Sequence, residues 1–129
     1  MFLFEYQAKA MMREQGIPVL EGIVATSEQR ALDAARELGE GPWVIKAQIH
    51  AGGRAEGRVG GSEDLRGIEF SNTVLGVGQT AARMLGKSLV TPQTTRQGET
   101  INAVYIEPEI RSELQVFLAI LIDGERGEP

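Results

Sequence analysis

The stretch "WVIKAQIHAGGR", residues 43–54, decides the fold that this sequence predicts. Its residues alternate between an apolar side and a more polar side of an extended chain. The apolar side carries Trp43, Ile45, Ala47 and Ile49, and the other side carries Val44, Lys46, Gln48 and His50. This alternation is typical of a strand with one buried face. Two glycines and an arginine follow directly, which raises the question of which anion Lys46 meets.

The segment after this strand is dense in glycine. Residues 52–61 contain five glycines, a density that neither a helix nor a central strand tolerates. We therefore expect a loop whose backbone N–H groups can approach a polyanion, with an ammonium from Lys46 and a guanidinium from Arg54. Nucleotide phosphate fits that chemistry. An alternative stays open, in which Lys46 extends into solvent beside an ordinary surface loop.

The N-terminal segment predicts a helix over residues 5–15. This stretch lacks glycine and proline, is rich in Ala, Met, Gln and Lys, and is followed by Gly16. With Tyr6, Met11 and Met12 it is expected to pack on the core rather than to bind a cofactor.

A strand-to-helix junction is predicted next. The β-branched run at residues 22–26 indicates a short strand, and Thr26 with Gln29 has the spacing of a helix-capping box. The helix that follows presents one narrow apolar face of small residues, formed by Ala31, Ala34, Ala35 and Leu38. Such a face can lie close on a sheet.

The middle of the chain carries weaker signals. Ser62, which is followed by two acidic residues, is expected to begin a short helix. Its hydroxyl can cap the N-terminus of a helix, and carboxylates in the first turn are stabilised by the positive end of the helix dipole. Residues 70–78 show no usable periodicity, and residues 80–85 predict one or two helical turns before Gly86.

The C-terminal part is predicted to be β-structure. Residues 88–94 indicate an edge strand because Pro92 cannot donate a ladder hydrogen bond, and residues 96–99 indicate a turn. Residues 100–109 and 113–123 are strongly β-type and are expected to pair antiparallel. The order of elements predicts an α+β fold with helices packed on one mostly antiparallel sheet.

Composition narrows the functional classes. The chain has 129 residues, of which 42% are hydrophobic and 24% charged, as expected for one folded domain. Its net charge of −5 argues against nucleic acid as a partner. Zero cysteines exclude disulfides, Fe–S clusters and a catalytic thiol, and His50 as the only histidine excludes a histidine metal cluster. No apolar run reaches membrane-spanning length, so we expect a cytoplasmic protein without membrane contact.

Common nucleotide-binding motifs are absent, but several acidic residues are candidates for nucleotide contacts. Neither a P-loop nor the G-x-G-x-x-G motif occurs. Glu107, Glu109 and Glu113 surround the predicted junction of the last strands, where carboxylates could accept hydrogen bonds from a ribose or a base amine. The alternative is that these three glutamates belong to a solvated polar turn. His50 is expected to be a half-exposed residue at the end of a strand.

Four blocks of this sequence nevertheless resemble one family. They are "FEYQAKAMMREQGIPV", "GPWVIKAQIHAGGR", "LGKSLVTPQT" and the run "VYIEP…EL…FLAILID", in that order. Together they are similar to the N-terminal part of the beta subunit of succinyl-CoA synthetase and its malate-CoA ligase relatives. The resemblance spans nearly the whole chain but about a third of such a subunit.

The resemblance implies a fold and a set of site residues. The fold would be the smaller N-terminal lobe of an ATP-grasp protein over residues 21–129, after a helical segment over residues 1–20 that in the family packs on the larger lobe. Lys46 would contact the nucleotide phosphates, beneath a loop that contains Gly53, Arg54 and Ala55. Glu107 would lie near the purine and ribose, and Glu113 would be a second nucleotide contact.

The resemblance also implies a reaction. ATP or GTP with Mg²⁺, a dicarboxylate and coenzyme A would give the acyl-CoA, the nucleoside diphosphate and phosphate, through a phosphohistidine on an alpha subunit. The family's Mg²⁺ ligands, second lobe and substrate residues would lie beyond Pro129. Because phosphoryl transfer depends on positioning and charge stabilisation, we expect the isolated chain to be inactive. The resemblance does not distinguish succinate from malate or ATP from GTP.

Two departures from the family and two alternatives complete the prediction. Ala55 and Glu56 replace a glycine and a lysine of the family loop, which adds a Cβ and a negative charge beside the expected phosphate. Two residues are missing between Glu107 and Glu113. The competing function is a non-catalytic interaction module that uses an exposed strand edge to bind a partner or itself. A different ATP-grasp carboxylate ligase would share the lobe but not the four blocks.

Overall fold

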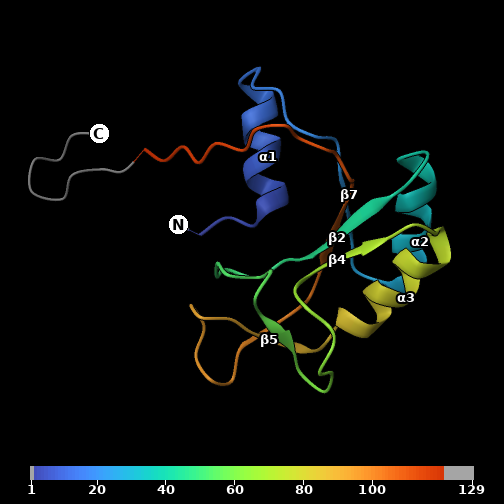
Figure 1. Ribbon diagram of the computed structural model, residues 1–129, viewed down its shortest axis with the longest axis vertical. Helices are drawn as coiled ribbons and strands as arrows, with labels where there is room; N and C mark the ends of the chain where they lie inside the picture. The colour runs from blue at the N-terminus through green and yellow to red at the C-terminus, as the bar shows by residue number, and fades with distance from the viewer. Residues whose placement is uncertain (1, 121–129) are drawn as a thin grey trace, which may run out of the picture.

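The computed structural model describes residues 2–120, and its helices lie on both sides of a small sheet (Figure 1). In chain order the elements are α1 (Glu5–Glu14), β1 (Ile23–Ala25), α2 (Glu28–Glu37), β2 (Trp43–Ala47), β3 (Arg58–Val59), β4 (Ile68–Ser71), α3 (Val74–Met84), β5 (Ser88–Val90), β6 (Glu99–Thr100) and β7 (Val104–Pro108). No helix among the described residues is long and apolar enough to cross a bilayer.

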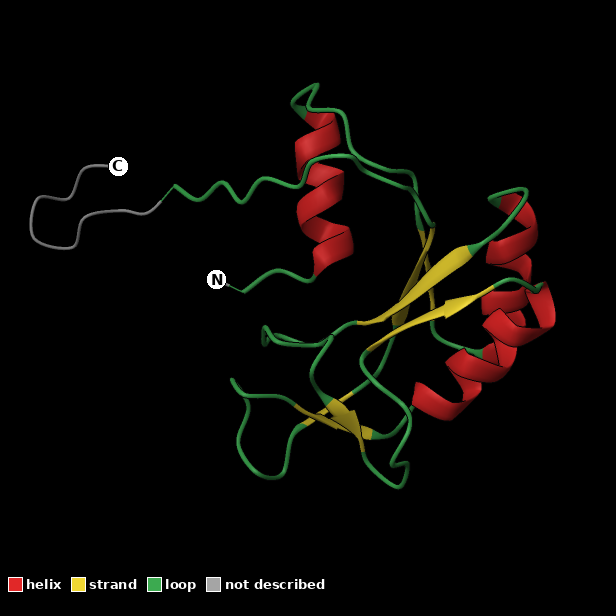
Figure 2. Cartoon of the chain, in the orientation of Figure 1, coloured by secondary structure: helices red, strands yellow, loops and turns green. Residues whose placement is uncertain are grey.

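The described strands form two sheets (Figure 2). One has four strands in the order β1-β7-β2-β4, the other has three in the order β3-β5-β6, and every pairing is antiparallel. The predicted α+β class with antiparallel strands is confirmed, although two sheets replace the single predicted sheet.

The strand register separates the four-stranded sheet into two faces. Ile45 lies opposite Ile106 on one face, and both side chains are fully buried. On the other face Lys46 lies opposite Tyr105, and Glu107 lies on the neighbouring strand. The alternation predicted for β2 is therefore present, and Lys46 is on the polar face as expected.

Helices α2 and α3 cover the apolar face (Figure 1). Their buried positions are mostly small: Ala31, Ala34 and Ala35 in α2, and Val77, Gly78, Ala81 and Met84 in α3. Small side chains let the two helices approach each other closely. A Cβ on Gly78 would come within 2.5 Å of Leu32 Cδ2. Helix α2 begins one residue later than predicted, because Ser27 rather than Thr26 accepts the capping hydrogen bond, from the Arg30 N–H at 3.1 Å.

Helix α1 lies on the opposite side of the sheet, and its predicted packing on the core is wrong. None of its ten residues, all of which are described, is buried. Met11 and Met12 are 51% and 45% exposed. Charged side chains of α1, rather than its methionines, face the sheet. Helix periodicity alone could not show which side of α1 the sheet would meet.

The segment between the two sheets differs from the prediction. Among the described residues no helix begins at Ser62, whose hydroxyl instead hydrogen-bonds Asp64 at 2.7 Å. Helix α3 begins at Val74 instead of residue 80, because the Thr73 hydroxyl accepts a capping hydrogen bond from the Gly76 N–H at 3.0 Å. Strand β4 was not predicted: its four residues alternate between apolar and polar, but so short a run is a weak signal.

Two strand predictions near the C-terminus are also wrong. Strand β5 is the central strand of its sheet rather than an edge, because Pro92 lies after the strand has ended. The partners of β7 are β1 and β2, and the described residues 113–120 are exposed and form no strand. Residues 121–123 of the predicted strand lie outside the described part. A β-type composition forms a strand only where a partner edge is available.

Candidate functional site

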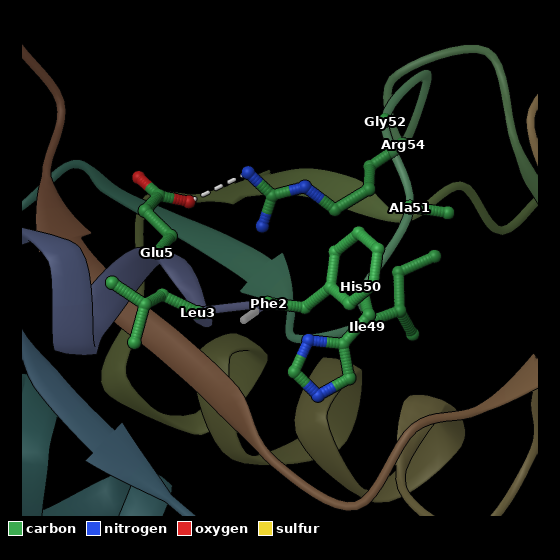
Figure 3. A pocket seen from close by; sticks show the side chains of 8 residues that line it. All are labelled: Phe2, Leu3, Glu5, Ile49, His50, Ala51, Gly52 and Arg54. Carbon is green, nitrogen blue, oxygen red and sulfur yellow. Dashed lines mark hydrogen bonds and ion pairs between the residues drawn. The ribbon is translucent and has the colours of Figure 1, made fainter. Parts of the chain in front are cut away.

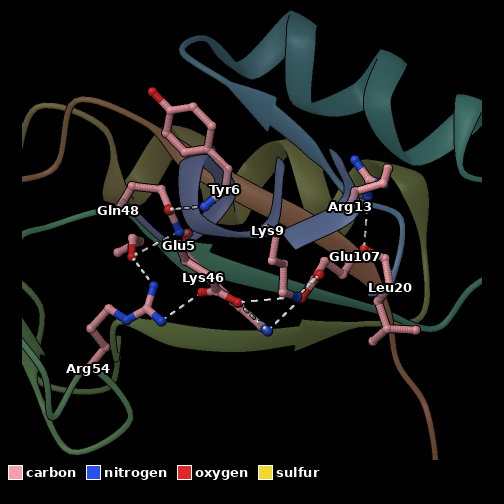
Figure 4. A network of polar contacts seen from close by, with 10 residues as sticks. Glu5, Tyr6, Lys9, Arg13, Leu20, Lys46, Gln48, Arg54 and Glu107 are labelled. Carbon is pink, nitrogen blue, oxygen red and sulfur yellow. Dashed lines mark hydrogen bonds and ion pairs between the residues drawn. The ribbon is translucent and has the colours of Figure 1, made fainter. Parts of the chain in front are cut away.

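Lys46 meets two carboxylates of its own chain (Figure 4). Its Nζ donates to Glu5 Oε1 at 3.0 Å and to Glu107 Oε2 at 2.5 Å. Glu5 lies in the first turn of α1 and Glu107 lies on β7, so three separate elements meet at this ammonium group. The alternative in which Lys46 extends into solvent is thereby excluded.

Glu107 is the most deeply buried member of this cluster. Its side chain is 1% exposed, and each of its oxygens is paired with a different lysine: Oε1 with Lys9 and Oε2 with Lys46. A buried carboxylate is costly unless it is paired and hydrogen-bonded, and two ammonium groups meet that need. Lys9 also lies 5.4 Å from the ring centroid of Tyr105, a cation–π contact that holds α1 near the sheet.

Arg54 reaches the same cluster from the glycine loop. Its Nη2 donates to Glu5 Oε2 at 2.7 Å, and its Nη1 donates to the Ala47 carbonyl at 2.9 Å. Gly53 allows this approach because it has a φ of +73°, a region that favours glycine. The Gly52 N–H donates to Gln93 Oε1 at 3.0 Å. The loop is therefore held against the segment after β5.

The electrostatics of the cluster keep Glu5 and Lys46 ionised. Burial acts to raise the pKa of Glu5, but the hydrogen bonds and charges of Arg54 and Lys46 outweigh it and lower that pKa from 4.5 to about 2. Burial acts to lower the pKa of Lys46, but the carboxylates of Glu107 and Glu5 raise it above its ordinary value. Three cationic and two anionic side chains leave a net positive charge, which favours an additional anion.

Two cavities adjoin the cluster. One, of about 350 Å³, is lined by Lys46, Glu107 and mostly apolar neighbours: Leu20, Val44, Ile68, Phe70, Pro108 and Ile110, with Glu109 and Gln115. The other, of about 300 Å³, is lined by Phe2, Leu3, Glu5, Ile49, His50, Ala51, Gly52 and Arg54 (Figure 3). The ion pair of Glu5 with Lys46 joins a residue that lines the second cavity to a residue that lines the first. A ligand with a flat apolar part and an anionic part could use both.

The structure brings together only some of the residues predicted for the site. Lys46, Arg54 and Glu107 converge, and Gly53 lies beside Arg54 in the same turn. The remaining two are exposed: Ala55 lies in the turn and Glu113 in the irregular segment after β7. The roles of these six residues toward a nucleotide remain predictions.

Glu5 and Lys9 were not identified from the sequence as members of the cluster. Glu5 and Lys9, which lie 3.4 Å apart as an i,i+4 pair, face the sheet although α1 was expected to use its apolar residues. Their spacing was the available signal, but it indicates an exposed pair equally well. His50, expected as a half-exposed strand-end residue, is exposed in the segment after β2 and stacks on Phe4, with ring centroids 3.9 Å apart.

The described residues do not form a divalent cation site. They contain no group of three or more side chains placed as metal ligands. The carboxylates of Glu5 and Glu107 are already paired with ammonium and guanidinium groups, which a cation would have to displace. This donor set therefore does not fit Mg²⁺, and it fits an anion better.

An antiparallel sheet that carries a lysine and a glycine loop beside a cavity is an arrangement that could hold a phosphate. Comparison with known families agrees, since the family described as the ATP-grasp domain matches residues 2–129. The chain belongs to the ATP-grasp family.

Its relatives specify the family member more closely. The chain is 42% identical to the beta subunit of ADP-forming succinate-CoA ligase of Acidithiobacillus ferrooxidans, over 99% of this chain and 30% of that subunit. It is 42% identical to the same subunit of Cereibacter sphaeroides and 43% identical to that of Paracoccus denitrificans, each over 95% of this chain and 32% of the relative. The resemblance inferred from the four sequence blocks is confirmed. The chain spans about a third of the length of these relatives.

Proposed function

We propose that the chain binds ATP or GTP as the nucleotide-binding part of an NDP-forming acid-CoA ligase. The observation that carries the proposal is the convergence of Lys46 and Arg54 on one anionic group, the carboxylate of Glu5. Two cations from a strand and a glycine loop that hold one anion can hold a phosphate in the same way. The net positive charge of the cluster supports this assignment.

The cavity beside Lys46 is suited to the purine and ribose. Its apolar lining includes Val44, Ile68 and Phe70, and Phe70 is 61% exposed, so a flat base would cover apolar surface that water now contacts. Glu107 lines the same cavity and offers acceptor atoms for a ribose hydroxyl. The base and the phosphates would then lie on either side of Lys46.

The complete reaction needs more than these residues supply. The relatives are named as beta subunits of an ADP-forming succinate-CoA ligase, and this chain spans 30% to 32% of their length. In the proposal, the chain contributes nucleotide contacts to an assembly with an alpha subunit that joins succinate or malate to coenzyme A. Residues outside the described part would hold Mg²⁺, and the chain by itself would not catalyse, because half of the positioning groups would be missing.

A second candidate function is an interaction module. The observation that favours it is a run of exposed apolar side chains after β7: Leu114, Val116, Phe117, Leu118 and Ile120. Contiguous exposed apolar surface of this kind marks many protein contacts. In this alternative the chain would bind a partner or a second copy of itself without binding a nucleotide.

Titration calorimetry with ATP separates the two functions. We expect saturable binding by the wild-type chain and at least tenfold weaker binding by Lys46→Gln, because that substitution removes one of the two phosphate-binding cations. Lys87→Gln is the matched control, since Lys87 is exposed and forms no ion pair with a described residue. Circular dichroism checks that each variant is folded.

The interaction module predicts the opposite outcome. No heat of binding at millimolar ATP, together with a molar mass that rises with protein concentration in light scattering, would support it. Equal affinities of the wild type and Lys46→Gln would contradict the proposed placement of the phosphates.

A further inference from the structure

Glu5 occupies the position that the proposed phosphate would need. One of its oxygens lies 3.0 Å from Lys46 Nζ and the other lies 2.7 Å from Arg54 Nη2. These are the distances of charge-assisted hydrogen bonds, so both cations are engaged by one carboxylate. A phosphate bridging the same two donors would overlap this carboxylate, and the two anions would also repel each other.

The helix that carries Glu5 is attached to the sheet mainly by polar side chains. No residue of α1, which the structure describes in full, is buried. Its attachments include the ion pairs of Glu5 and Lys9, the cation–π contact of Lys9 with Tyr105, a long hydrogen bond of 3.4 Å from the Tyr6 N–H to Gln48, and the tilted contact of Tyr6 with Tyr105. These attachments depend on charge and bury no residue of α1, whereas α2 and α3 are held by buried apolar contacts. Helix α1 can therefore leave without opening the core.

Displacement of Glu5 would not leave a buried charge without a partner. Glu107 is the buried carboxylate of the cluster, and it is paired with both Lys9 and Lys46. Because Lys46 Nζ donates to both Glu5 and Glu107, a phosphate that replaces Glu5 leaves the bond from Lys46 to Glu107 in place. Because the pKa of Glu5 is held at about 2, the group that is displaced is an anion at any physiological pH.

We propose that Glu5 is an internal competitor for the nucleotide phosphates, so that docking of α1 on the sheet and binding of phosphate at Lys46 and Arg54 oppose each other. This inference rests on the proposed nucleotide-binding function. It adds that the structure with Glu5 between the two cations is the nucleotide-free arrangement. Phosphate binding releases Glu5 and loosens α1, and removal of the Glu5 charge strengthens phosphate binding.

The first test compares Glu5→Gln with Glu14→Gln by titration calorimetry. Glu14 lies on the same helix, is exposed and forms no ion pair with a described residue, so its substitution changes the net charge equally. The probes are ADP, inorganic triphosphate and adenosine. We expect Glu5→Gln to bind ADP and triphosphate about fivefold or more tightly than the wild type, within the usual range of coupling between sites. Affinity for adenosine, and every affinity of Glu14→Gln, should stay unchanged.

The second test measures the reciprocal effect on α1. Coupling between two binding events acts equally in both directions, so triphosphate should accelerate hydrogen exchange of the α1 backbone amides in the wild-type chain. Tyr6→Ala removes the contact of Tyr6 with Tyr105 and so weakens the packing of α1 on the sheet, but it leaves the Glu5 charge. This variant should also bind triphosphate more tightly than the wild type. This variant keeps the inference testable if Glu5→Gln does not fold.

The outcomes distinguish this inference from the proposed function. Loss of ADP binding in Lys46→Gln, together with unchanged or weaker binding in Glu5→Gln, would overturn the competition and make Glu5 a residue that positions the two cations. Slower exchange of α1 amides with triphosphate bound would overturn it as well. Absence of ADP binding in every variant would overturn the proposed function and this inference together.

Discussion

The two faces of the four-stranded sheet are built from the same strands but are held in different ways. On one face Ile45 and Ile106 are fully buried beneath α2 and α3. On the other face Lys46 and Glu107 meet charged side chains of α1, a helix with no buried residue. Buried apolar area stabilises the first face regardless of ionisation, whereas the second depends on charge. One sheet can therefore carry an apolar face whose stability does not depend on ionisation and, on its other side, a charged face whose stability does.

The largest expected effect is on the apolar face. Ile45→Ala should lower the free energy of unfolding by about 2–5 kcal/mol, because it leaves a cavity beneath the two helices where the structure cannot fully collapse. Urea denaturation followed by circular dichroism measures this. Val116→Ala is the matched control, since that side chain is 77% exposed and its truncation should change the free energy by less than about 0.5 kcal/mol. Similar losses for both variants would contradict the assigned core.

A smaller effect is expected on the charged face, and it should depend on pH. The folded-state pKa of Glu5, about 2, lies below its ordinary value of 4.5. Ionised Glu5 therefore stabilises the folded chain above pH 4.5, and this contribution disappears as the pH falls toward 2. The difference in unfolding free energy between wild type and Glu5→Gln should be on the order of 2 kcal/mol at neutral pH, after allowance for solvent screening.

Urea titrations at a series of pH values check that dependence. The difference between wild type and Glu5→Gln should shrink across the window between the two pKa values, while Glu14→Gln should follow the wild type throughout. A difference that stays constant down to pH 2 would show that Glu5 acts through packing rather than through its charge.

The smallest effect is expected on the outer side of α1. Met11→Gln should change the free energy of unfolding by less than about 0.5 kcal/mol, because Met11 is 51% exposed and removes little apolar area from water. Thermal or urea denaturation measures it. A loss of about 2 kcal/mol or more, typical of a buried methionine, would restore the predicted packing of this helix on the core.

Much of the fold could be predicted because its signals are local. The alternation of residues 43–49 places Lys46 on the polar face, and the small-residue spacing of residues 31–38 identifies the side of α2 that meets the sheet. Helix α3 was predicted too short, because the glycines within it weaken the helical signal. Strand β4 was missed, because it has only four residues. The division into residues 1–20 and 21–129 remains a prediction.

The site could be predicted only in part. Lys46, Arg54 and Glu107 were named from residue chemistry and from the family resemblance, and the fold brings them together. Glu5 and Lys9 were not named, because an i,i+4 pair of opposite charges near the start of a helix is common on exposed surfaces. Glu113 was named from the family resemblance alone; it is exposed after β7, and its role remains a prediction.

The sequence by itself determined the two-faced central strand, the glycine-rich turn after it and the membership in the ATP-grasp family. These follow from interactions between residues a few positions apart and from an ordered set of matching blocks. Only the tertiary structure decided which anion Lys46 meets, since Glu5 lies 41 residues before it and Glu107 lies 61 residues after it. Periodicity sets the face on which a side chain lies, whereas the partner across that face depends on how distant elements pack.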